Sequence, residues 1–137
     1  MSVSLDTAEV GTAVAQRAFP PFTREDLRRY AEASGDLNPL HLDPEFARQA
    51  GFDDVIVHGM LGMAMLGRLV TESFPDYRLK LFGARFRKIV PIDEPIKCTA
   101  RLESWRDGVA LLTLAATDVS GVTLIEGTAT IAVAPQS

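Results

Sequence analysis

One segment of this chain is apolar on nearly every face of a helix. It runs from Gly59 to Ser73 and reads GMLGMAMLGRLVTES. A helix with this pattern is expected to be buried all round, because it offers no polar stripe to water. The surrounding apolar stretch, residues 55–70, contains His58 and Arg68 and is shorter than the ~20 residues needed to cross a bilayer. The rest of the chain must therefore fold around this helix.

Four strand-like segments follow the apolar helix. They are residues 79–89, 96–104, 109–119 and 122–133. Arg106-Asp107-Gly108 and Ser120-Gly121 separate the last three segments and favour tight hairpin turns. We therefore expect a meander of hairpins that curls round the helix, because no other part of the chain is large enough to bury it.

The first half of the chain carries helix signals, after one short strand at residues 12–19. Thr23 stands where an N-cap should be, acidic residues follow it, and Gly35 ends a helical repeat of apolar residues. Asp43, followed by a proline, repeats the start signal for a short helix to Ala50. Helices and strands in separate halves predict an α+β domain with an antiparallel sheet.

The length and the net charge of the chain exclude some classes of function. The chain has 137 residues and a formal net charge of -4, with 14 Lys and Arg against 18 Asp and Glu. No repeat or linker divides it, so residues 1–137 are assigned to a single domain and a two-domain enzyme is excluded. No basic block is visible, which argues against nucleic acid or a membrane surface as the partner. The mildly acidic composition fits a small neutral or apolar ligand better than a nucleic acid or a membrane surface.

Two further features concern the thiol chemistry and the compartment. Cys98 is the single cysteine and lies in an apolar alternating stretch, so we expect a buried thiol with no internal disulfide. The N-terminal segment contains Asp6 and Glu9 and has neither a positive start nor a long apolar run, unlike a secretory signal. These features predict a cytoplasmic protein.

Asp36 and His41 lie in a loop-rich stretch, five positions apart. On an α-helix this spacing would place them about 140° apart around the axis. Gly35 and Pro39 supply a bend that lets both side chains point at one place. A carboxylate and an imidazole around one water molecule form a general acid and base pair. The alternative is structural, because residues such as Asn38 cap loop backbone and a loop histidine is often only hydrogen-bonded.

His58 and Gly59 begin the apolar helix. The free N–H groups and partial positive charge of a helix start, with a glycine that admits a ligand, suit an oxyanion site. In the alternative, Gly59 only lets the helix pack and His58 bonds a loop carbonyl, which for His58 alone we favour. No metal is expected, because His41, His58, Asp36 and Asp43 lack the short ligand spacing typical of zinc sites.

Two other clusters are open to two interpretations. The methionines of the apolar helix, beginning at Met60, form core more often than they line a tunnel for an acyl chain, so core is expected. Arg85, Arg87 and Lys88 are typical of a solvated strand edge. As an alternative, Arg85 and Arg87 would bind the phosphates of coenzyme A or phosphopantetheine.

Residues 30–41 read YAEASGDLNPLH, which resembles the signature of the MaoC-like hydratases, a family of (R)-specific enoyl-CoA hydratases and (3R)-hydroxyacyl-ACP dehydratases. The VHGML of residues 57–61 and the segment at 85–91 are similar as well. The chain is most similar to the short actinobacterial type of dehydratase catalytic subunit. The resemblance implies a hot-dog fold, in which a curved antiparallel sheet wraps a long central helix, and a dimer.

The resemblance also implies roles for individual residues. Asp36 and His41 would be the catalytic pair, Asn38 would orient them, and the amide of Gly59 would bind the thioester oxygen. One departure concerns residues 62–64, which read Gly-Met-Ala where many relatives carry a small hydroxyl residue. The resemblance therefore does not supply a substrate-positioning hydroxyl at these residues.

We predict reversible, (R)-specific addition of water to a trans-2-enoyl thioester of coenzyme A or acyl carrier protein, without a cofactor. Asp36 would activate the water, His41 would relay a proton toward C2, and Gly59 would stabilise the enolate-like oxygen. Three alternatives remain: a hot-dog thioesterase, a pathway-specific polyketide or secondary-metabolite dehydratase, and a non-catalytic acyl-binding subunit. A homodimer is expected, because no residues are left over to complete a tunnel; a heterodimer with a second hot-dog subunit is the alternative.

Overall fold

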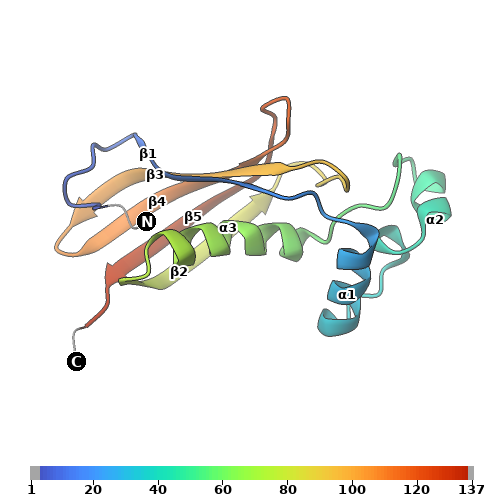
Figure 1. Cartoon of the computed structure of the whole chain (residues 1–137), viewed down its shortest axis with the longest axis horizontal. Helices are drawn as coiled ribbons and strands as arrows, with labels where there is room; N and C mark the ends of the chain where they lie inside the picture. The colour runs from blue at the N-terminus through green and yellow to red at the C-terminus, as the bar shows by residue number, and fades with distance from the viewer. Residues whose placement is uncertain (1–3, 136–137) are drawn as a thin grey trace.

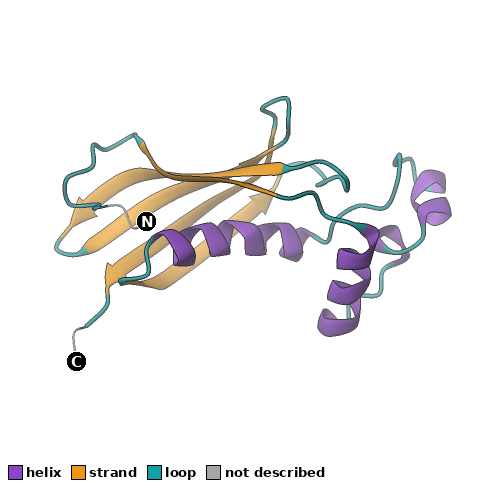
Figure 2. Cartoon of the chain, in the orientation of Figure 1, coloured by secondary structure: helices purple, strands orange, loops and turns teal. Residues whose placement is uncertain are grey.

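The computed structural model describes residues 4–135; the first three and last two residues of the predicted domain lie outside the described residues. Helix α3, Gly59–Ser73, lies along one face of a five-stranded antiparallel sheet (Figure 1). The shorter helical segments gather at the N-terminal end of α3, beside the end of the sheet (Figure 2). This arrangement confirms the predicted α+β hot-dog fold.

The first strand, β1, is Ala13–Phe19, and the first helix, α1, is Arg24–Ser34. The hydroxyl of Thr23 accepts a hydrogen bond from the backbone N–H of Asp26 at 3.1 Å, and the Asp26 carboxylate accepts one from the Thr23 N–H at 2.9 Å. This reciprocal capping box fixes the start of α1. The helix ends at Gly35, whose φ of 81° lies in the left-handed region that favours glycine. Both predicted boundaries are confirmed.

Two short helical segments follow. The 3₁₀ turn η1 is Pro39–His41, and the helix α2 is Pro44–Gln49. The carboxylate of Asp43 accepts hydrogen bonds from the backbone N–H groups of Glu45 at 3.0 Å and Phe46 at 3.3 Å. Asp43 is therefore the cap of α2, as its start signal predicted.

The remaining strands are β2 (Tyr77–Phe86), β3 (Ile96–Arg106), β4 (Val109–Thr117) and β5 (Thr123–Val133), in the spatial order β1-β3-β4-β5-β2. The hairpins that join β3 to β4 and β4 to β5 form at the predicted turns. In the first of these turns, Asp107 has a φ of 53° and Gly108 a φ of 78°. Left-handed backbone at both positions is what a type I′ hairpin turn requires.

The predicted meander is wrong at β2, which pairs with β5 and not with β3. Residues 87–95 connect β2 to β3 and contain two prolines, so they form no tight hairpin turn. The side chains of Val90 and Ile92 are buried, and the Val90 carbonyl accepts a hydrogen bond from the N–H of Val57 at 2.9 Å. The connection therefore packs beside the start of α3 and carries the chain across to the other edge of the sheet.

Helix α3 is buried only on the side that faces the sheet, so the expectation of all-round burial is wrong for the single chain. The sheet covers one side, and Met60, which faces away from it, is 58% exposed. On the covered side a Cβ at Gly62 would lie 2.9 Å from Cδ1 of Ile125, so this glycine lets the helix approach β5 closely. The buried positions of α3 are Gly62, Leu66, Leu69 and Val70.

Two expectations concern single features. The Cys98 side chain is fully buried in β3, and burial raises the pKa of its thiol to about 12, which confirms the predicted buried thiol. Among the described residues, no helix combines the length and the apolar character needed to span a membrane.

Candidate active site

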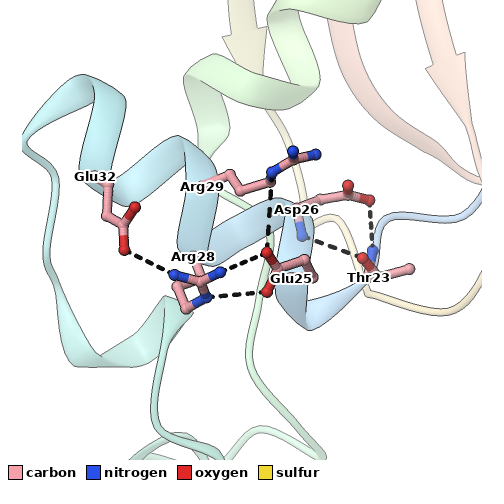
Figure 3. A network of polar contacts seen from close by, with 6 residues as sticks. All are labelled: Thr23, Glu25, Asp26, Arg28, Arg29 and Glu32. Carbon is pink, nitrogen blue, oxygen red and sulfur yellow. Dashed lines mark hydrogen bonds and ion pairs between the residues drawn. The ribbon is translucent and has the colours of Figure 1, made fainter.

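Helix α1 ends where the candidate site begins, because Asp36 directly follows the left-handed Gly35. The surface of α1 carries a network of polar side chains around Arg28, whose guanidinium bonds Glu25 on one side and Glu32, at 2.8 Å, on the other (Figure 3). Exposed ion pairs of this kind add little stability. The capping box at the start of α1 is worth more, about 1 kcal/mol. It fixes the helix that presents Asp36.

The structure brings Asp36 and His41 together, with 3.9 Å between Oδ2 of the carboxylate and Nε2 of the imidazole. The bend between them is built locally. The side-chain oxygen of Asn38 accepts a hydrogen bond from the N–H of Leu40 at 3.0 Å, and Pro39 opens η1. The N–H of Asn38 in turn donates to Oδ1 of Asp36 at 3.3 Å. Asn38 therefore shapes the loop through these two contacts.

The tautomer of neutral His41 follows from its hydrogen bond to the Ile56 carbonyl, where Nδ1 and the oxygen are 2.7 Å apart. A carbonyl only accepts, so Nδ1 carries the proton and Nε2 keeps its lone pair. Nε2 and the carboxylate of Asp36 are then two acceptors facing each other across 3.9 Å, too far for a direct hydrogen bond. A water molecule, which has two O–H donors, matches this pair of acceptors.

His58 is the one buried polar side chain among the described residues, with 1% of its surface exposed. Its Nε2 lies 3.2 Å from the main-chain carbonyl oxygen of Asp36, to which it donates. Its ring stacks on that of His41, with centroids 3.9 Å apart, and meets the edge of Tyr30 at 4.8 Å. Burial is the larger cause that lowers the pKa of His58, and the charge of the neighbouring His41 is the second. The carbonyl contact is the loop hydrogen bond favoured in the sequence analysis.

Gly59, the first residue of the 15-residue helix α3, lies next to His58. Among the described residues, the backbone N–H groups of Gly59 and Met60 have no hydrogen-bond acceptor, as is usual for the first turn of a helix. A Cβ at Gly59 would lie 3.2 Å from the ring of Phe86, so any larger residue here would press on that ring. These free donors, at the positive end of the helix dipole, can stabilise a negative oxygen.

The cluster of Asp36, His41 and His58 also contains three side chains of the types that bind metal ions. Ligand atoms of Asp36, His41 and His58 all lie within 4.8 Å of one another. However, the two imidazole rings are stacked with their planes only 22° apart, so their in-plane lone pairs lie in separate, nearly parallel planes and do not converge on one ion about 2.0–2.1 Å away. One nitrogen of each ring is also bonded to a carbonyl. The arrangement favours acid and base chemistry.

Other predicted residues lie apart from this cluster. Phe86 faces Gly59, so Arg85, its neighbour in β2, points to the opposite face of the sheet. There Arg85 and Arg87 line a groove of about 610 Å³, and Arg87 binds the Glu126 carboxylate at 2.8 and 3.0 Å. Within one chain these arginines do not reach the Asp36 and His41 pair.

Sequence reasoning missed two contributors to the site and misplaced one. Ile56 supplies only a carbonyl, which no residue type signals. Tyr30 opens the family-like motif, which was a signal, but its contact with His58 comes from tertiary packing. The core interpretation is wrong for the exposed Met60, because this residue faces away from the sheet that covers the other side of α3.

Comparisons with known proteins show which family and which folds the chain is similar to. Residues 6–122 match the family model described as MaoC like domain. The chain is 32% identical over 112 residues to 3-hydroxyacyl-thioester dehydratase Z of Mycobacterium tuberculosis, covering 77% of this chain and 74% of that protein. It is 45% identical over 75 residues to a mitochondrial 3-hydroxyacyl-[acyl-carrier-protein] dehydratase of Arabidopsis thaliana, covering 55% of this chain and 45% of that protein, so it spans less than half of the plant relative.

Among solved structures, the chain is similar to the (R)-hydratase from A. caviae involved in PHA biosynthesis. The two superpose with a TM-score of 0.84 at 26% identity, over 93% of this chain and 98% of that one. The family model covers most of the chain, and the M. tuberculosis relative matches along two thirds or more of both proteins. The chain therefore belongs to the MaoC-like domain family.

Proposed function

We propose that this protein catalyses the reversible, (R)-specific hydration of trans-2-enoyl thioesters to (3R)-hydroxyacyl thioesters. The observation that carries the proposal is the pair of facing acceptors, the Asp36 carboxylate and Nε2 of His41, 3.9 Å apart. This spacing suits one water molecule held by both groups. The hydratase and dehydratase names of the relatives support the same reaction class.

In the hydration direction, the oxygen of the held water attacks C3 of the enoyl group. As the C–O bond forms, one proton of the water passes to the pair formed by Asp36 and His41, which act as a coupled base. The electron pair of the double bond moves onto the thioester oxygen, where the free N–H of Gly59 stabilises the enolate. The pair then returns a proton to C2, the carbonyl reforms, and the net change is the addition of one water.

The test is an assay of the purified chain on crotonyl-CoA. We expect the enoyl absorbance to fall without release of free thiol, and the product to be the (3R) enantiomer. Thiol release would instead assign the chain as a thioesterase. No change in absorbance over a panel of short to long enoyl thioesters would contradict the proposal and favour a non-catalytic acyl-binding subunit.

The carrier of the acyl group is a separate proposal. We propose that Arg85, on the outer face of β2 and exposed, binds a phosphate of coenzyme A or phosphopantetheine, with Arg87 and its partner Glu126 beside it. Arg85→Ala and Arg87→Ala should raise KM for crotonyl-CoA and leave kcat unchanged. An unchanged KM in both variants would contradict this carrier site.

The cytoplasmic location of the protein, which was expected from the N-terminal segment, remains a prediction.

We also propose that the chain works as a homodimer. Met60 on α3 and Phe86 on the edge strand β2, whose ring faces Gly59 at the start of α3, are 58% and 51% exposed. Large apolar side chains along one edge are typical of a surface that another protein covers, and a second copy presents the same surface. Light scattering at micromolar concentration should give the mass of a dimer. A monomer would contradict the homodimer, and pairing only with a second hot-dog chain would support the heterodimer.

A further inference from the structure

We infer that His58 is a positioning residue that sets the spacing of both members of the catalytic pair. Its Nε2–H holds the main-chain carbonyl of Asp36, and its ring face holds the imidazole of His41. The inference rests on the proposed hydratase function, because it explains how the two acceptors are kept at water-binding distance.

The contacts of His58 join three elements that are separate in the sequence. His58 precedes α3, Tyr30 belongs to α1, and His41 ends η1. The Tyr30 and His58 ring centroids are 4.8 Å apart, and those of His41 and His58 are 3.9 Å apart. A shift of His58 would therefore be passed to the ring of His41 by direct contact, and to Asp36 through its carbonyl.

The histidine side chain combines the two properties that this task needs. Histidine places a donor at the tip of a flat ring, so one group bonds a carbonyl while its face packs on another ring. Glutamine offers a donor without a rigid face, and phenylalanine offers a face without a donor. Both functions of His58 are used at once in this site.

The other ring nitrogen of His58 supports the same conclusion. Nδ1 is buried and has no hydrogen-bond partner within residues 4–135. A buried acceptor left without a donor lowers stability, and such groups in folded proteins call for a specific explanation. Local conflicts of this kind are expected at functional sites. We attribute this one to the orientation of the ring, because the bond to Asp36 and the stack on His41 turn Nδ1 away from any donor.

The first test reads the tautomers without any assay of activity. The chain has only two histidines, so ¹⁵N-labelled histidine gives two ring systems in a long-range ¹H–¹⁵N spectrum, and His58→Gln assigns them. At a pH about two units above the usual histidine pKa of about 6.5, we expect His41 protonated at Nδ1 and His58 at Nε2. A wild-type His58 protonated at Nδ1 would overturn the inference, because it would not donate to the Asp36 carbonyl.

The second test separates positioning from stability. His58→Gln keeps the donor and removes the ring, whereas His58→Phe keeps the ring and removes the donor. Both should lower kcat for crotonyl-CoA about 10- to 100-fold with KM within about threefold, because a small misplacement of a catalytic group costs up to about 100-fold in rate. Val70→Ala is the matched control, since Val70 is buried in α3, the helix that His58 precedes, and lies about 18 Å further along its axis. It should lower the Tm and leave kcat within about twofold.

The outcomes distinguish the inference from the proposed function. An inactive wild-type chain would contradict the proposed function, and the tautomers would still test the geometry of His58. An active wild type in which either His58 variant keeps its full kcat would overturn the inference alone. Should a variant fail to fold, the wild-type spectrum still decides between the two tautomers.

Discussion

Replacing Gly35 with alanine should weaken the site more than the fold. Gly35 has φ 81° and ψ 1°, and a Cβ there would meet no atom of the described residues within 4 Å. Steric contact therefore adds nothing to the loss of unfolding free energy. This loss comes from the left-handed backbone alone, which costs about 1–2 kcal/mol for an L-residue with a side chain. In a chain of this size each kcal/mol lowers the Tm by roughly 3–5 °C. The strain is relieved if the last turn of α1 unwinds, which would displace Asp36.

The experiment compares three variants by urea unfolding and by initial rates on crotonyl-CoA. Gly35→Ala should lose about 1 kcal/mol of unfolding free energy and a larger share of kcat, while Gly35→Asn, which tolerates left-handed backbone, should recover most of both. Gly121→Ala is the matched control, since Gly121 has a φ of 87° and open space around it in the β4–β5 turn. It should lose similar stability and keep its activity. Equal loss of activity in Gly35→Ala and Gly121→Ala would refute the reasoning.

Three further predictions concern single groups. The Cys98 thiol, with its pKa raised to about 12, should not react with a thiol reagent until the chain is unfolded; rapid native labelling would contradict its burial. Because burial lowers the pKa of His58, the unfolded chain binds more protons below the usual ~6.5, so the free energy of unfolding should fall there as the pH drops. Urea titrations should show this fall weakened in His58→Phe; identical pH profiles would count against it. At Gly62 an alanine Cβ would lie 2.9 Å from Ile125, so Gly62→Ala should cost about 1–3 kcal/mol, and Ile125→Val should restore part of it.

The elements that the sequence predicted correctly are those set by local chemistry. Thr23 and Gly35 fix both ends of α1 through a capping box and a left-handed cap, which involve only neighbouring residues. The turn at Asp107 and Gly108 is equally local. The partner of β2 was predicted wrongly, because the sequence of a strand does not indicate which distant strand it pairs with. Here the connection at residues 87–95, which buries Val90 and Ile92, carries the chain to the other edge of the sheet.

The candidate site shows the same division. Asp36 and His41 were paired from their spacing of five positions and a bend between them, and the structure places Oδ2 and Nε2 of the two side chains 3.9 Å apart. The contacts of Tyr30 and Ile56 were missed because they come from other elements. The exposure of Met60 was missed for a different reason. An apolar helix sequence signals that its surface must be covered, without saying whether its own sheet, a ligand or another chain covers it.

The central claim is that Asp36 and His41 act as one unit on one water molecule, and a double-mutant cycle tests it most directly. Asp36→Asn and His41→Ala should each lower kcat for crotonyl-CoA about 10²- to 10⁴-fold, while the Tm stays near that of the wild type. The double variant should be no more than about tenfold slower than the slower single variant, because removing either member already disables the pair. Near-full turnover in either single variant, or losses that multiply in the double variant, would contradict the account.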